Sequence, residues 1–217
     1  MKRLYGIGTG PGDPELLTLK AVRIMKESDI IFAPNNKGKN MALDTAREFI
    51  GDKEIVYIDF PMRHVTRSDY REGADTIFNR IPDGGSGAFL TIGDPMIYST
   101  FIYIMEELAD RDIEVEIVPG IPSFVAGAAQ SKMPLTVKGD SFVLCDEFHE
   151  ELIEHGESVA ILKTLKDKKK ILDILEERGY EYRYIKKVTL EEQDILVHRE
   201  DILEDKNYMS LILGRKK

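Results

Sequence analysis

Three short turns rich in glycine, proline and aspartate have the composition of ligand-binding loops. Residues 5–14 read Tyr-Gly-Ile-Gly-Thr-Gly-Pro-Gly-Asp-Pro, and two similar turns follow at Gly93-Asp94-Pro95 and Pro119-Gly120. Glycine lets a backbone take positive φ and approach a ligand closely, and proline holds such a turn in one shape. A flexible linker would not need proline between its glycines. We therefore predict that these turns line a site for a small molecule.

The glycine pattern does not match the common nucleotide-binding loops. A dinucleotide fingerprint, G-x-G-x-x-G, that starts at Gly6 or Gly8 would need its third glycine where Pro11 or Asp13 stands. A P-loop needs lysine directly after its last glycine, and no lysine follows before Lys20. A tight turn that binds no ligand remains the alternative.

Strands and helices alternate along the first half of the chain. Strands are expected at 3–8, 29–33, 54–60, 88–92 and 115–118, and helices at 19–27, 41–50, 68–81 and 99–109. This alternation predicts a mostly parallel sheet with helices on its faces. Ligands bind beyond the carboxyl ends of such strands, where the three turns lie.

The pattern changes after residue 118. We expect helices at 122–131, 147–155 and 166–178, and strands at 141–145, 158–162, 180–189 and 208–213. The predicted fold is two α/β domains, residues 1–117 with a mostly parallel sheet and 118–217 with a mixed sheet, and an active-site cleft between them. The first domain carries the glycine-rich loop, and the second completes the pocket.

Composition excludes several classes of protein. The net charge of −9 argues against a nucleic-acid partner, because phosphate binding requires a basic field. No apolar run reaches the roughly 18 residues of a membrane helix, and no apolar segment follows the basic start as in a signal peptide. Cys145 is the one cysteine, so no internal disulfide can form. These features predict a cytoplasmic protein with no membrane partner.

Four motifs in series resemble the tetrapyrrole methylases. They are residues 6–21, which begin with the glycine-rich turn, then residues 29–34, 91–99 and 118–125. Together they cover most of the chain in the order of that family. The stretches 93–99 and 119–124 most resemble the members that methylate carbon 20 of precorrin-2 or of its cobalt form, cobalt-factor II.

The resemblance implies a C-methyltransferase of cobalamin biosynthesis that uses S-adenosylmethionine, acts on a tetrapyrrole and forms a homodimer. The implied cofactor contacts are Pro11, Ile92, Gly93, Asp94, Ile97, Pro122, Ser123, Lys163 and Val188. The sequence departs from its relatives at three of these: Pro122 stands where they have threonine, Lys163 where they have methionine, and Val188 where some have glycine. Each position also has a plain structural interpretation: isoleucines in the core, Asp94 capping its own turn, Lys163 at a solvated strand end.

Substrate contacts are expected on the glycine-rich loop and on a basic stretch. The expected residues are Gly8, Gly10, Gly12, Asp13, Arg63 and Arg67. Because the substrate carries many carboxylates and the protein is acidic, residues 61–71 are the best candidate for a local positive patch; the alternative is a solvated loop that leads into a helix.

The expected reaction is an in-line displacement in which an electron-rich ring carbon takes the methyl group. Tyr98, Asp94 and His64 are candidates for a base that removes a proton from that carbon, and the sequence does not choose among them. The four histidines are scattered, so we predict no protein-bound metal. Two alternatives remain: a family member that acts on another ring position or on a protein, as diphthine synthase does, and a non-catalytic nucleotide-binding module.

Overall fold

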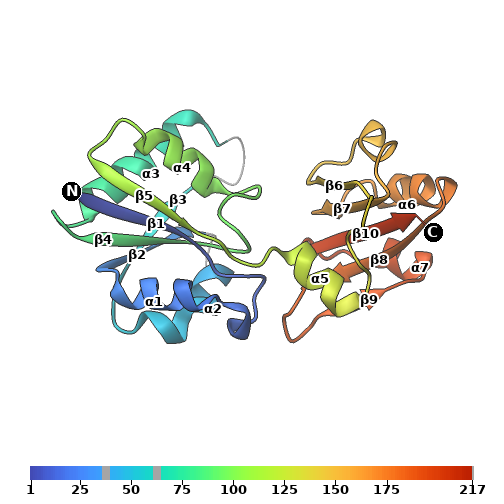
Figure 1. Ribbon diagram of the computed structural model, residues 1–217, viewed down its shortest axis with the longest axis horizontal. Coiled ribbons are helices and arrows are strands. Elements are labelled where there is room, and N and C mark those ends of the chain that lie inside the picture. The colour runs from blue at the N-terminus through green and yellow to red at the C-terminus, as the bar shows by residue number, and fades with distance from the viewer. Residues whose placement is uncertain (36–39, 61–64, 217) are drawn as a thin grey trace. The chain divides into compact units, whose positions relative to one another are not determined.

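The chain divides into two compact units, Met1–Pro122 and Ser123–Lys217, in a computed structural model that describes residues 1–35, 40–60 and 65–216 (Figure 1). The boundary predicted after residue 117 lies inside the strand β5 (Ile113–Val118). Because β5 pairs with β1 (Lys2–Gly8) along its length, the first unit includes all of β5 and the turn after it.

The first unit is a parallel sheet covered by helices on both faces. The strand order is β3-β2-β4-β1-β5, and every described pair is parallel. The remaining strands are β2 (Ile30–Asn35), β3 (Glu54–Asp59) and β4 (Ser86–Thr91). The helices are α1 (Leu19–Glu27), α2 (Met41–Ile50), α3 (Arg67–Arg80) and α4 (Thr100–Leu108), preceded by the short 3-10 helix η1 (Pro14–Leu16).

Alternate residues of the central strands build two cores. Ala88 and Leu90 of β4 pack with α1 and α2, whereas Phe89 packs with α3 and α4 on the opposite face. Figure 1 shows the two helix pairs on either side of the sheet. On the α4 side, Gly6 leaves room for Phe101, because a Cβ atom at Gly6 would lie 2.2 Å from the Phe101 ring.

The second unit has the predicted mixed sheet, in the order β6-β7-β10-β8-β9. Its β6–β7 pair is parallel and its other described pairs are antiparallel. The strands are β6 (Phe142–Cys145), β7 (Ser158–Leu162), β8 (Tyr180–Lys186), β9 (Asp194–Leu196) and β10 (Ser210–Lys216). The helices are α5 (Ser123–Ser131), α6 (Lys168–Glu177) and α7 (Arg199–Glu204), with the 3-10 helix η2 (Glu150–Ile153).

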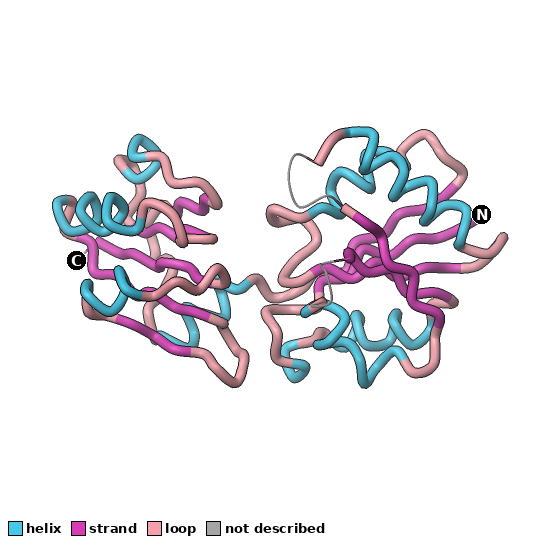
Figure 2. The backbone as a smooth tube through the Cα atoms, turned by 180° about the vertical axis from the view of Figure 1, so that it is seen from behind, coloured by secondary structure: helices cyan, strands magenta, loops and turns pink. Residues whose placement is uncertain are grey.

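The two faces of the second sheet are covered by different helices. Tyr184 and Ile212 pack with α6 and α7 in one core. Their neighbours along the strands, Ile185 and Leu211, lie against Gly127 of α5. Figure 2 shows these helices around the strands of the second unit. Among the described residues, no helix of either unit has the length and apolar character needed to cross a membrane.

Sequence patterns failed in three places in the second unit. The helix expected at 147–155 is only the short η2, whose N-cap residue His149 makes no capping side-chain hydrogen bond. The strand β9 and the helix α7 were not expected, because three and six residues are too few to show a periodic pattern.

Candidate active site

We call the segment that follows the last residue of a strand its exit. The exits of β4, β1 and β5 lie side by side, because these strands are neighbours in the sheet. After β1 and β4, Gly10 and Gly93 exchange two backbone hydrogen bonds, with N···O distances of 3.2 and 2.7 Å. Thr9 N also donates to Thr91 O at 2.8 Å. The predicted convergence of the glycine turns at the carboxyl ends of the strands is therefore confirmed.

Three glycines bring the main chains of these exits into direct contact, and we call Gly8, Gly93 and Gly120 the glycine junction. A Cβ atom on Gly120 would lie 2.1 Å from the carbonyl oxygen of Gly93, and one on Gly8 would lie 2.5 Å from Gly120 N. Gly93 also has a φ of +71°, which side chains rarely permit. Only glycine therefore fits at the junction.

Asp94 fastens the junction through both carboxylate oxygens. Its Oδ1 accepts the backbone N–H of Met96 at 2.8 Å, and its Oδ2 accepts that of Gly120 at 3.0 Å. The first bond caps the turn of Asp94 itself, as the plain structural interpretation of this residue expects. The second crosses to the exit of β5, which sequence spacing could not predict. Asp94 therefore fixes the relative position of two exits.

Apolar side chains at the exit of β4 are turned toward solvent. The exposed fractions of Ile92, Met96 and Tyr98 are 42%, 46% and 47%. The interpretation of Ile92 as an ordinary core residue is therefore wrong. Ile97 is half-buried, and Pro122 Cα lies 3.8 Å from the position of a Cβ on Gly93. An apolar surface beside backbone polar groups suits a ligand with an aromatic and a polar part.

The glycine-rich loop turns sharply after β1. Gly10 and Gly12 have φ values of +71° and +141°, and Pro11 between them is buried. Asp13 accepts the N–H of Glu15 at 2.8 Å and so starts η1, and the hydroxyl of Thr45 donates to Gly12 O at 3.3 Å. The loop is thus held from α2 as well as from its own cap.

The basic stretch that sequence analysis offered as a substrate patch is partly neutralised. Arg63 and His64 lie outside the described residues. Arg67 Nε donates to Oε1 of Glu107 at 2.6 Å, and Arg71 Nε donates to Oε2 at 3.1 Å. The Glu107 side chain is only 8% exposed. Hydrogen bonds from Arg67 and then Arg71 hold the pKa of Glu107 below its ordinary value.

In the second unit, two of the predicted cofactor positions lie near the start of β10. The strands β7 and β8 flank β10 and end on either side of it. Lys163 N donates to Ser210 O at 3.0 Å, and a Val188 methyl lies 3.8 Å from the position of a Cβ on Gly127. Lys163 also pairs with Asp146 at 3.5 Å. The third position, Ser123, is the first residue of α5, the helix of Gly127.

Comparison with known proteins identifies the family of this chain. A model of the tetrapyrrole (corrin/porphyrin) methylases matches residues 3–203. The chain therefore belongs to the tetrapyrrole methylase family, and it is a methyltransferase.

Two relatives and one solved structure illustrate the similarity. A probable cobalt-precorrin-2 C(20)-methyltransferase of Methanocaldococcus jannaschii is 34% identical over 225 residues, which cover 100% of this chain and 97% of the relative. A cobalt-precorrin-2 C(20)-methyltransferase of Salmonella typhimurium is 34% identical over 148 residues, 65% of this chain and 62% of the relative. A uroporphyrin-III C-methyl transferase of Thermus thermophilus, solved with S-adenyl homocysteine, has a TM-score of 0.72 at 20% identity and matches 98% of this chain and 92% of its own.

Substitution of Gly120 by alanine tests the close packing of the junction. Because the new Cβ would overlap backbone atoms that cannot move independently, Gly120→Ala should lower the free energy of unfolding in urea by about 3 kcal/mol. Gly84→Ala is the control, because Gly84 also sits in a turn but has no atom within 4 Å of its Cβ position; its positive φ alone should cost about 1 kcal/mol. Equal stability of the two variants would contradict the packing argument.

The pairing of Glu107 with two arginines predicts a pH-dependent stability. Because its pKa is lowered on folding, Glu107 contributes stability above the ordinary carboxyl pKa of about 4.3, and this is lost as pH falls through the lowered value. Glu107→Gln should therefore be less stable than wild type at pH 7, and the difference should shrink in acid. Urea unfolding between pH 7 and 3 measures it. Glu106→Gln on the same helix is the control, and a gap for Glu107→Gln that stays constant with pH would contradict the pairing.

Proposed function

We propose that this protein uses S-adenosylmethionine to methylate carbon 20 of precorrin-2 or of its cobalt form, cobalt-factor II, in cobalamin biosynthesis. The observation that carries the proposal is the 34% identity to a probable cobalt-precorrin-2 C(20)-methyltransferase over all of this chain. Another ring position or a protein substrate is less well supported, since two relatives with the same specificity in their names match at this level. A non-catalytic nucleotide-binding module does not agree with membership in a methyltransferase family.

Both units are proposed to provide cofactor contacts. In the first unit, the half-exposed Ile92 and the neighbouring Ile97 offer apolar contacts, and the backbone near the glycine junction offers donors and acceptors. In the second unit, Ser123, Lys163 and Val188 are the proposed contacts. Pro11, Gly93, Asp94 and Pro122 complete the set; among these, Asp94 acts by holding the turn, because both its carboxylate oxygens already accept backbone N–H groups.

The residues of the site serve mainly to position the reactants. Bound S-adenosylmethionine supplies an activated methyl group, and the leaving thioether is neutral, so little acid assistance is needed. Holding the reacting atoms in line can lower a barrier by up to ~7–11 kcal/mol. The glycine junction suits this task, because the backbones of three strand exits are in close contact there. As a candidate base, Tyr98 is better placed than Asp94, since it is 47% exposed beside the turn.

Substrate contacts are proposed on the glycine-rich loop and at the start of α3. Gly8 and Gly10 are buried, so they shape the loop, whereas Gly12 and Asp13 are partly accessible. Arg67 remains a proposed contact for a substrate carboxylate, because its side chain is 81% exposed although it also pairs with Glu107.

The proposal includes a cytoplasmic homodimer, for which the exposed ring of Tyr103, stacked on Tyr70, is a candidate surface.

A turnover assay tests the proposed function. Purified protein is incubated anaerobically with S-adenosylmethionine and, in parallel, precorrin-2 or cobalt-factor II, and the products are analysed by mass spectrometry. We expect the gain of one methyl group at carbon 20 on at least one macrocycle. No transfer to either macrocycle, or transfer to a different carbon, would contradict the proposal.

Within this assay, Ile92→Ser tests the proposed cofactor surface. Because Ile92 is already half-exposed, its loss should leave the folded state nearly unchanged. If the side chain becomes buried on cofactor binding, the KM for S-adenosylmethionine should rise about tenfold. Val137→Ser is the matched control, because Val137 is 52% exposed and has no proposed role in the site. Equal KM values for the two variants would remove Ile92 from the cofactor site.

A further inference from the structure

In the second unit, the segments that follow β7 and β8 are both hydrogen-bonded to one turn. The exits are residues 163–167 after β7 and 187–189 after β8, and the turn is residues 205–210, whose last residue is the first of β10. Lys163 N donates to Ser210 O at 3.0 Å, and Lys187 N donates to Met209 O at 2.8 Å. Both exits therefore follow the position of this turn.

The two exits hold an unusual backbone. Lys163, Asp167, Lys187 and Thr189 have φ values of +55°, +57°, +49° and +64°, and none of them is glycine. Such conformations cost free energy and persist only where the surroundings hold them, which is most often at functional sites. Lys163 and Val188, two proposed cofactor contacts, lie in these same segments.

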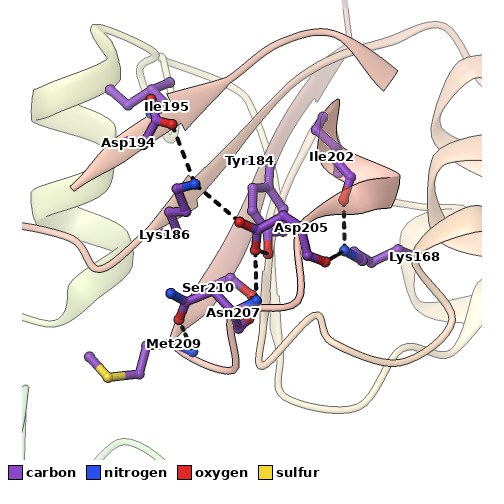
Figure 3. A network of polar contacts seen from close by, with 10 residues as sticks. All are labelled: Lys168, Tyr184, Lys186, Asp194, Ile195, Ile202, Asp205, Asn207, Met209 and Ser210. Carbon is purple, nitrogen blue, oxygen red and sulfur yellow. Dashed lines mark hydrogen bonds and ion pairs between the residues drawn. The ribbon is translucent and has the colours of Figure 1, made fainter. Parts of the chain in front are cut away.

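Asp205 is the residue that holds the turn (Figure 3). Its carboxylate accepts hydrogen bonds from Tyr184 Oη at 2.7 Å, Lys186 Nζ at 3.1 Å and the N–H of Asn207 at 2.7 Å. Burial alone would raise the pKa of Asp205, but the bonds from Asn207, Tyr184 and Lys186 outweigh it and lower the pKa. The carboxylate thus joins the turn to the end of β8.

The turn is also anchored from α6 and from the segment that follows β7. Lys168 at the start of α6 is buried, and its Nζ donates to the carbonyl oxygens of Asp205 and Ile202, the latter at 2.6 Å. Farther along the turn, Ser210 Oγ donates to Asn207 O at 3.0 Å and lies 3.0 Å from Thr164 Oγ1. Asp205 is at the centre of these contacts, because its carboxylate bonds to β8 and to the turn while its carbonyl oxygen accepts from Lys168.

We propose that Asp205 is a positioning residue: by holding residues 205–210 in place, it sets the conformation of the two strand exits from which the second unit contacts the cofactor. The inference rests on the proposed function, since the cofactor is the ligand for which the exits are held. Asp205 itself touches no reactant. It acts through Lys186, Asn207 and the backbone bonds to Lys163 and Lys187.

The test compares the full-length wild type with Asp205→Asn and with Asp194→Asn. Asp194 also pairs with Lys186, at 3.4 Å, but it is exposed and has no described bond to the turn, so it is the matched control. Dissociation constants for S-adenosylhomocysteine are measured by calorimetry, and KM and kcat by steady-state kinetics. Circular dichroism and thermal unfolding confirm that each variant is folded.

Asp205→Asn should bind S-adenosylhomocysteine at least about tenfold more weakly, with an equal rise in the KM for S-adenosylmethionine. The KM for the tetrapyrrole and the kcat at saturating cofactor should change less than about twofold, a split that a general loss of stability would not produce. Asp194→Asn should stay within about twofold of wild type in all constants. A folded Asp205→Asn that binds as wild type does would overturn the inference.

Two further outcomes are decisive. If Asp205→Asn does not fold, Tyr184→Phe replaces it, because this change removes one hydrogen bond to the same carboxylate and keeps the buried ring. It should weaken S-adenosylhomocysteine binding severalfold, and unchanged binding would overturn the inference. If the wild type itself binds no S-adenosylhomocysteine, the proposed function fails and the inference fails with it. If the wild type binds but the folded variants bind equally well, only the positioning role is lost.

Discussion

The first unit depends on one constraint, the direct contact of three main chains at the glycine junction. The exits of β1, β4 and β5 approach so closely that Gly8 and Gly120 leave no room for a Cβ atom. Asp94 then joins two of these exits by accepting N–H groups from both. Because backbone atoms cannot adopt alternative rotamers, this contact fixes the loop geometry more firmly than side-chain packing would. The apolar surface around Ile92 is held in place by that geometry.

In the second unit, the strand exits are held by a polar network and not by contacts between glycines. Its exits carry lysine, aspartate and threonine in left-handed conformations in place of glycine, and a polar network around Asp205 holds them. A backbone contact is insensitive to charge, whereas a network of this kind depends on Lys168, Lys186 and Asp205 remaining ionised. Substitutions of the junction glycines should therefore act through overlap, whereas substitutions around Asp205 should act through loss of hydrogen bonds.

Local signals in the sequence predicted most of the first unit. The helices expected at 19–27 and 99–109 correspond to α1 and α4, and the structure shows capping hydroxyls at their starts: Thr18 accepts the N–H of Ala21, and Ser99 accepts that of Phe101. The bonds between Asp94 and Gly120 and between Arg67 and Glu107 were not predictable, because they join residues 26 and 40 positions apart. The network around Asp205 was missed for the same reason, and because α7 and β9 are too short to show periodicity. Family resemblance supplied the candidate cofactor residues, which spacing alone would not have selected.

The central claim is that the glycine junction and its exits form the cofactor surface. Hydrogen–deuterium exchange, followed by mass spectrometry with and without saturating S-adenosylhomocysteine, tests it most directly. Peptides that cover residues 92–98 and 119–123 should exchange more slowly when the ligand is bound, while peptides from α3 at residues 67–80 should not change. If the ligand binds and slows exchange elsewhere but leaves residues 92–98 and 119–123 unaffected, the account of the site is wrong.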